Sequence, residues 1–199
     1  QFIDFGGWTL LEKTLLRIKN PIFDAPIITT NELYLNLVKK YLSKHKFKEY
    51  CIIVEPLKKN TSPAIASTLV IQDIFHDNPM IFFPADHLIE KINQFNKSIN
   101  LNKKYLNEDN IFVFGIKPKS PSSQYGYFLT KKNSKGLNKV IKFIEKPNEN
   151  HAKKIIKRKG YWNSGILLAR KDSIINNFKK YQNKTLNLCI ESVYKSKVS

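Results

Sequence analysis

Short apolar runs, each about the length of a strand, alternate along the chain with segments in which apolar residues recur every three or four positions. The runs predict strands over 25–30, 50–54, 80–83, 111–116, 140–144 and 166–169. The spaced segments predict helices over 9–19, 31–42, 64–75, 89–99 and 149–159, with a further helix capped by Asp172. Strands that alternate with helices are typical of βαβ units, so we predict one α/β domain with a Rossmann-like, mainly parallel sheet flanked by helices.

A carboxylate follows the apolar run that lies between Pro79 and Pro84. Such a run is typical of a buried central strand, and parallel sheets bind ligands beyond the carboxyl ends of their strands. Asp86 is therefore well placed to ligate Mg²⁺, which prefers oxygen ligands, and His87 would be a second polar contact. The alternative is that Asp86 only caps the following helix, since Asp is a favoured N-cap.

Other polar groups also follow predicted strands. Glu145 beside Lys146 pairs an acceptor for hydroxyl groups with a cation for phosphate, although a surface ion pair at a turn is the alternative. Asn163 would bind a hydroxyl group or stabilise its own turn. Gly126, which follows Tyr125, would let the backbone approach a ligand or would serve only as a turn glycine.

A second group lies after the predicted strand over 50–54. Glu55 ends that strand, and Asn60 and Thr61 follow in a polar turn. Asn60 and Thr61 would hydrogen-bond the edge of a base, or would cap the helix that begins near Pro63. Because the carboxyl ends of parallel strands share one edge of a sheet, we expect all these groups to converge on one cleft.

The composition of the chain limits the classes of protein to which it can belong. The chain of 199 residues is 42% hydrophobic and 12% aromatic with 7 Gly, which is typical of a folded globular protein. No apolar run reaches the roughly 20 residues of a spanning helix, so we expect a cytoplasmic protein without membrane contact. Cys51 and Cys189 lie in apolar segments without metal-ligand spacing and are expected to be free thiols.

The net charge of +18 has two readings. It is either a footprint for nucleic acid or another polyanion, or a solvated lysine coat. Lysines are spread over nearly every segment while arginines, which specific nucleic-acid readers favour, are few, so we expect no nucleic-acid partner.

Taken in order, five motifs resemble the mannose-1-phosphate guanylyltransferases. The motifs are Glu55-Pro56-Leu57-Lys58-Lys59-Asn60-Thr61-Ser62-Pro63-Ala64-Ile65-Ala66, Pro84-Ala85-Asp86-His87, Phe114-Gly115-Ile116 with Tyr125-Gly126-Tyr127, Phe143-Ile144-Glu145-Lys146-Pro147, and Trp162-Asn163-Ser164-Gly165. The resemblance covers essentially the whole chain and implies the nucleotide-diphospho-sugar transferase fold. It also implies the reaction of GTP with mannose 1-phosphate to give GDP-mannose and pyrophosphate, with Mg²⁺ as cofactor.

The resemblance also implies roles for individual residues. Asp86 would ligate the metal and Lys146 would contact the sugar-side phosphate, which makes these two the expected catalytic residues. Glu145 would hold mannose hydroxyl groups. The other expected substrate-binding residues are Glu55, Asn60 and Thr61 for the nucleotide and Tyr125, Gly126 and Asn163 for the sugar.

The chain departs from the family's pattern at both ends. The family's glycine-rich phosphate loop belongs just before Gln1, and a second metal-binding aspartate is not evident before Ser199. We therefore expect 1–199 to be a partial transferase domain, truncated at both ends, that turns over GTP very slowly by itself. The alternative is a non-catalytic remnant or subunit of a split transferase that keeps the sugar-nucleotide pocket. The resemblance leaves homo-oligomer formation open.

Overall fold

The chain forms two compact units in a computed structural model. The structure describes residues 2, 4, 6–57, 60–71, 79–132 and 137–196. Unit 1 comprises Gln1–Ile111 and Leu168–Ser199, and unit 2 comprises Phe112–Leu167.

Unit 1 contains a small parallel sheet. Strands β1 (Ile27–Asn31) and β2 (Cys51–Glu55) pair in parallel from Ile27 opposite Cys51 to Asn31 opposite Glu55. The crossover between them consists of the 3-10 turn η1 (Glu32–Tyr34) and helix α2 (Leu35–Lys44). This βαβ unit confirms the predicted alternation in the first part of the chain.

The core of unit 1 joins α1 (Leu10–Ile18) to α2. Leu11, Leu15, Val38 and Leu42 are buried together, which confirms the helical spacing predicted for both segments. Thr9 caps α1 reciprocally with Glu12: each side chain accepts a hydrogen bond from the other residue's backbone N–H.

Glu12 also anchors α1 to the end of α2. Its Oε1 accepts a hydrogen bond from Lys44 Nζ at 2.7 Å and lies 3.1 Å from His45 Nε2. Burial alone would raise the pKa of Glu12, but the hydrogen bonds from Lys44, Thr9 and His45 outweigh it and lower that pKa to about 2. This carboxylate is therefore charged at neutral pH although its side chain is only 3% exposed.

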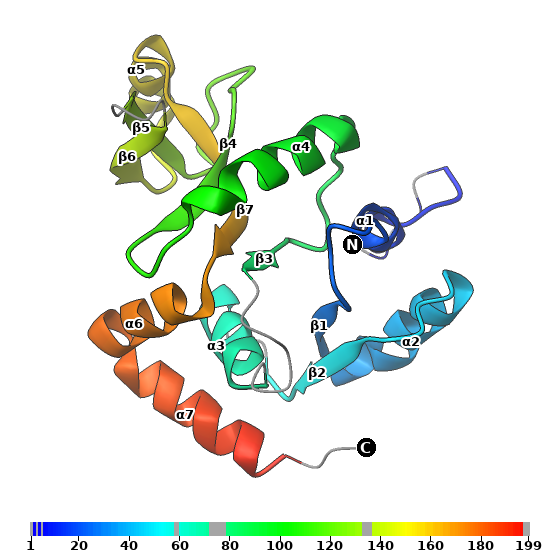
Figure 1. The fold of residues 1–199 in the computed structure, drawn as a ribbon. Helices are drawn as coiled ribbons and strands as arrows, with labels where there is room; N and C mark the ends of the chain where they lie inside the picture. The colour runs from blue at the N-terminus through cyan, green and yellow to red at the C-terminus, as the bar shows by residue number, and fades with distance from the viewer. Residues whose placement is uncertain are drawn as a thin grey trace. The chain divides into compact units, whose positions relative to one another are not determined.

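In unit 1, helices α6 (Lys171–Tyr181) and α7 (Asn183–Tyr194) pack on helix α3 (Thr61–Ile71), as Figure 1 shows. Buried contacts include Cys189 Sγ, which lies 3.7 Å from the Pro63 carbonyl oxygen. The remaining elements of unit 1 are β3 (Met80–Phe82), α4 (Ile92–Asn102) and η3 (Lys103–Tyr105).

Unit 2 is built on antiparallel strands, which makes the prediction of a mainly parallel sheet wrong for this unit. Strand β5 (Tyr127–Lys132) pairs antiparallel with both β6 (Asn138–Ile144) and β7 (Tyr161–Ala169). Only five residues separate β5 from β6, too few for the crossover that a parallel pair needs. Strand β4 (Ile111–Ile116) also pairs with β7.

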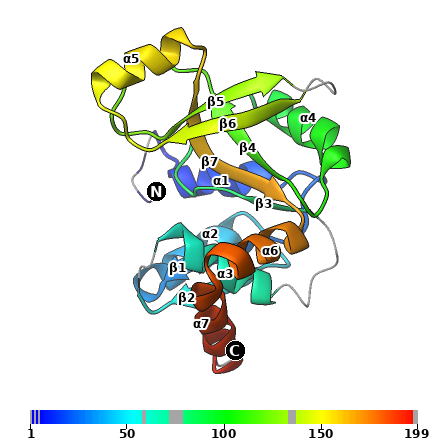
Figure 2. The same ribbon diagram turned by 90° about the vertical axis from the view of Figure 1, so that its left-hand side faces the viewer.

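Helix α5 (Glu149–Lys157) packs on β5 in unit 2, as Figure 2 shows. Ala152 and Ile155 of α5 are buried with Tyr127 and Leu129 of β5. Asn148 caps the helix by accepting a hydrogen bond from the His151 backbone N–H. The helix confirms the prediction over 149–159, but it ends two residues earlier.

Several predicted boundaries differ from the structure. Asp172 lies in the first turn of α6 and Arg170 is its N-cap, so the predicted cap is wrong. The sequence predicts a strand that begins at Ile166, but β7 begins at Tyr161 and so includes Trp162 and Asn163. The strand begins earlier because Tyr161 and Trp162 pair with residues of β5. The predicted helix over 64–75 begins earlier, at Thr61, and 72–75 lie outside the described residues.

Both cysteines are free, as predicted: Cys189 is buried and Cys51 is half-buried. Burial raises the pKa of the Cys51 thiol. Within the described residues, none of the helices has the length and apolar character that crossing a membrane requires.

Candidate functional site

Asp86 lies in a turn after β3. The aromatic ring of Phe83, which follows β3, packs against Phe23 and Phe95, each at a centroid distance of 5.8 Å. This packing fixes the chain just before the turn and leaves the Asp86 side chain exposed. The next helix begins at Ile92 with Lys91 as its N-cap, so the alternative in which Asp86 caps that helix is wrong.

Helix α1 holds the backbone on both sides of Asp86. Thr14 Oγ1 donates a hydrogen bond to the Ala85 carbonyl at 3.3 Å, and Arg17 Nη1 donates to the His87 carbonyl at 3.0 Å. Arg17 Nη2 also donates to Thr14 Oγ1 at 3.1 Å, which links the two contacts. We call Thr14 and Arg17 the clamp, because together they restrain the backbone that presents the Asp86 carboxylate.

The clamp is buried although it contains a charge. Arg17 is 3% exposed, and its guanidinium lies 5.1 Å from the centroid of the Phe83 ring. Burial lowers the pKa of Arg17 to about 10, so the side chain is still protonated at neutral pH.

Sequence reasoning missed the clamp, although a signal was present. Residue 14 is polar, yet on a helical wheel it adjoins the apolar face formed by Leu11, Leu15 and Ile18, whereas Arg17 lies about 100° or more from each of these and gave no such signal. A polar residue on a buried helix face needs a hydrogen-bond partner, which here is the turn around Asp86.

The predicted nucleotide residues lie at the end of β2 and the start of α3. Glu55 is the last residue of β2 and is half-buried, and burial raises the pKa of its carboxyl group. Asn60 is exposed with φ of +69°, and Thr61 is the exposed first residue of α3. Lys58 and Lys59 lie outside the described residues. Asn60 and Thr61, which are neighbours in the chain, thus lie at the N-terminus of α3.

Three predicted sugar residues come together in unit 2. The Asn163 backbone N–H donates a hydrogen bond to the Gly126 carbonyl at 2.8 Å, which joins the start of β5 to β7. A Cβ added to Gly126 would lie 2.7 Å from Glu145 Oε2 and 2.9 Å from Phe143 Cζ. A side chain at this position would therefore displace the exposed Glu145 carboxylate, which lies where that Cβ would stand.

Lys146 and Tyr125 adjoin these residues in the chain. We call Tyr125, Gly126, Glu145, Lys146 and Asn163 the sugar-side cluster. Lys146 has φ of +41°, an unusual conformation for a lysine, and it stands between exposed Glu145 and buried Pro147. The ring of Tyr125, 48% exposed, packs against Trp162 at a centroid distance of 5.1 Å. The alternative of a local ion pair between Glu145 and Lys146 finds no support among the described residues, where neither side chain forms a salt bridge.

The predicted residues therefore fall into two groups, one in each unit. Unit 1 holds Glu55, Asn60, Thr61 and Asp86, whereas unit 2 holds Tyr125, Gly126, Glu145, Lys146 and Asn163. The two residues expected to be catalytic belong to different groups.

The metal-binding chemistry of the described residues is limited. They contain no group of three His, Cys, Asp or Glu side chains that could hold a metal ion. A single exposed carboxylate such as Asp86 fits Mg²⁺ only in the way that nucleotide-dependent enzymes use it, with water and substrate phosphates as the other ligands.

Comparison with known proteins identifies the family. The family model described as "Nucleotidyl transferase" matches residues 1–198. The chain belongs to the nucleotidyl transferase family. Its relatives within the family include mannose-1-phosphate guanylyltransferases, as the resemblance of the five motifs predicts.

Two curated relatives illustrate the likeness. The alginate biosynthesis protein AlgA of Pseudomonas fluorescens is 30% identical over 96% of this chain and 41% of its own length. A mannose-1-phosphate guanylyltransferase of Escherichia coli is 30% identical over 93% of this chain and 42% of its own length. The chain thus spans about two fifths of the curated relatives that it matches.

A solved structure supports the fold of this nucleotidyl transferase. The mannose-6-phosphate isomerase of Helicobacter pylori matches with a TM-score of 0.85 and 24% identity, over 98% of this chain and 75% of that one. At that identity the likeness shows the fold alone. Together with the family model, this likeness supports the α/β nucleotidyltransferase fold.

Proposed function

We propose that this nucleotidyl transferase forms GDP-mannose and pyrophosphate from GTP and mannose 1-phosphate. The observation that carries the proposal is the sugar-side cluster, in which Gly126 just before β5, Asn163 on β7 and Glu145 in the turn after β6 come together. The similarity to mannose-1-phosphate guanylyltransferases at about 30% identity supports guanine and mannose as the substrates.

The residues of unit 2 act on the sugar phosphate in this proposal. The Glu145 carboxylate accepts hydrogen bonds from sugar hydroxyl groups, for which its exposed position beside Gly126 leaves room. Lys146 neutralises the phosphate. The aromatic face of Tyr125, supported by Trp162, borders the sugar. Such groups accelerate transfer by positioning and charge neutralisation rather than by covalent chemistry.

The residues of unit 1 act on the nucleotide. Glu55, Asn60 and Thr61 bind the base, and Asp86 is the residue that would hold Mg²⁺. When bound, Mg²⁺ neutralises the charge that develops as pyrophosphate leaves. The clamp keeps the Asp86 backbone in place, so the carboxylate needs little reorganisation when the nucleotide arrives.

Calorimetric titration of the chain with GDP-mannose, with and without Mg²⁺, tests the proposal, with UDP-glucose as the competing nucleotide sugar. We expect selective GDP-mannose binding that Mg²⁺ strengthens. Glu145→Gln should weaken it about tenfold or more, because a carboxylate that accepts hydroxyl hydrogen bonds is lost.

Glu149→Gln is the matched control, because Glu149 is an exposed carboxylate of the same unit that pairs only with Lys153 on its own helix. Equal losses in both variants, or equal binding of both nucleotide sugars, would contradict the proposed site. Because 1–199 by itself is expected to turn over GTP very slowly, the test rests on the binding of GDP-mannose and not on turnover.

A further inference from the structure

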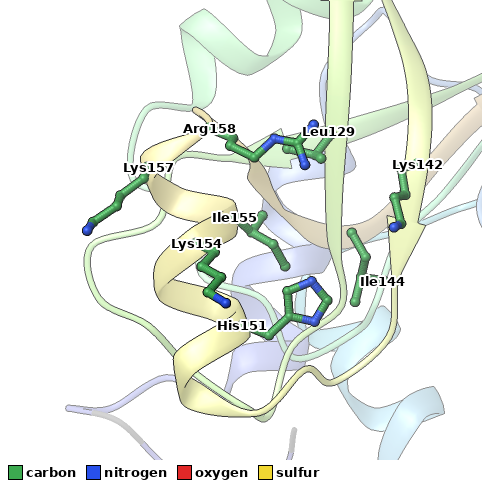
Figure 3. Close-up of a pocket in the computed structure, with 8 residues that line it drawn as sticks. All are labelled: Leu129, Lys142, Ile144, His151, Lys154, Ile155, Lys157 and Arg158. Carbon is green, nitrogen blue, oxygen red and sulfur yellow. The ribbon is translucent and has the colours of Figure 1, made fainter.

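A cavity of about 360 Å³ lies between α5 and the β5–β6 pair, and none of its lining residues belongs to the proposed reaction. Leu129 and Ile155, both buried, and half-buried Ile144 form its apolar floor. Figure 3 shows the cavity and its lining residues, which are Leu129, Lys142, Ile144, His151, Lys154, Ile155, Lys157 and Arg158. All of them belong to unit 2.

The rim of this α5 cavity carries positive charge from two walls. Lys142 comes from β6, and Lys154 and Arg158 come from α5, while Lys157 points away from β6 (Figure 3). No carboxylate lines the cavity, and the salt bridges of the described residues include none of these four side chains. Charges of one sign around an apolar floor repel each other, and a bound anion would relieve that repulsion.

The helix dipole explains only some of the positive charges around the cavity. Cations in the last turn of a helix interact favourably with its dipole, which accounts for Lys154, Lys157 and Arg158. It does not account for Lys142, which reaches the cavity from the opposite wall. The lining therefore combines an apolar surface with convergent cations, the two features that recognise an amphipathic anion.

We propose that the α5 cavity binds a small organic phosphate with an apolar body. The apolar part rests on Ile144 and Ile155, and the phosphate group lies between Lys142 and Arg158. The volume lies near the lower end of ligand pockets, roughly 300–1,000 Å³, and suits a single aromatic ring or a short alkyl chain. This site takes no part in the proposed transfer reaction.

Methyl-labelled NMR of the whole chain tests the site. Phenyl phosphate is the probe, benzyl alcohol supplies an apolar body without charge, and inorganic phosphate supplies charge without a body. We expect phenyl phosphate to shift the δ1 methyl signals of Ile144 and Ile155 saturably, while the two partial probes bind at least about tenfold more weakly.

Three variants assign the binding energy. Lys142→Met and Arg158→Met should each weaken phenyl phosphate binding by about threefold or more, as expected for exposed cations. Lys157→Met is the matched control and should change the affinity by less than about twofold, because the end of that side chain points away from β6, the wall that carries Lys142. If Arg158→Met disturbs folding, Lys142→Glu provides an exposed replacement that should abolish binding.

Several results would overturn the proposal. One is an equal loss in all three methionine variants, which would indicate general attraction to a basic surface. Another is binding of inorganic phosphate as tight as that of phenyl phosphate, which would mean that the apolar floor does not contribute to binding. Perturbation of the same methyl groups by a single-stranded oligonucleotide, with no response to phenyl phosphate, would indicate a nucleic-acid surface instead.

Discussion

Replacing Arg17 by methionine separates the role of the clamp in function from its role in stability. Methionine keeps an unbranched stem in the buried position but removes both hydrogen bonds, to the His87 carbonyl and to Thr14 Oγ1. Of the two hydrogen bonds that the clamp makes to the turn around Asp86, the 3.3 Å bond from Thr14 to Ala85 would then remain.

Two opposing energies partly cancel in this variant. Each hydrogen bond from a charged donor stabilises the fold by about 1.5–3 kcal/mol. Against this, the pKa of about 10 implies that burial costs the charged guanidinium at most about 3 kcal/mol, less after screening by solvent. The two hydrogen bonds together contribute about 3–6 kcal/mol, so we expect the free energy of unfolding to fall by about 3 kcal/mol or less, as when buried charges are exchanged for apolar groups.

The effect on the turn should be larger. We expect ¹⁵N relaxation order parameters of Asp86 and His87 to fall from about 0.85 toward 0.6, and the Mg²⁺-dependent part of GDP-mannose affinity to disappear. Arg17→Lys should restore only part of the rigidity, because an ammonium group cannot reproduce the fork of the guanidinium.

Lys13→Met is the control for this experiment, since Lys13 is an exposed cation of the same helix. Unchanged order parameters in Arg17→Met, or a loss of stability above about 4 kcal/mol, would refute the assignment of Arg17 as a positioning residue.

Two further predictions test one residue in each unit. Gly126→Ala should displace the Glu145 carboxylate and lower the affinity for GDP-mannose about tenfold. The free energy of unfolding measured in urea should change by less than about 1.5 kcal/mol, because Glu145 is exposed. An unchanged affinity for GDP-mannose would contradict the argument that Gly126 makes room for Glu145. Glu12→Gln should lower the free energy of unfolding by about 1–2 kcal/mol at pH 7, after allowance for the half-exposed Lys44. Because folding lowers the pKa of Glu12 from 4.5 to about 2, this contribution is complete above pH 4.5 and lost as the pH falls toward 2, so urea unfolding of the two proteins should converge there; a constant difference would exclude the charge as its cause.

The sequence predicted the local elements well because their signals are local. Helical spacing located the faces of α1 and α2 that carry Leu15 and Val38, and the polar groups after strands marked Asp86 and Glu145. The order of five motifs along the chain indicated the transferase family, which the family model confirms over residues 1–198.

The direction of the strands in unit 2 was misjudged although the chain contained a sign of it. The short connection between β5 and β6 excludes a parallel crossover, but Tyr127 to Lys132 showed no apolar run long enough to be read as a strand. Without that strand, β6 and β7 looked like successive members of a parallel sheet.

The sequence by itself determined where most helices and strands form, although not β5 or the cap of α6, because these depend largely on spacing within a few residues. Only the tertiary structure decided which distant groups meet. The bond from Arg17 to the His87 carbonyl joins residues 70 positions apart, and the approach of Glu145 to Gly126 depends on how strands pair. No local pattern encodes such contacts, because they follow from how whole elements pack around a shared core.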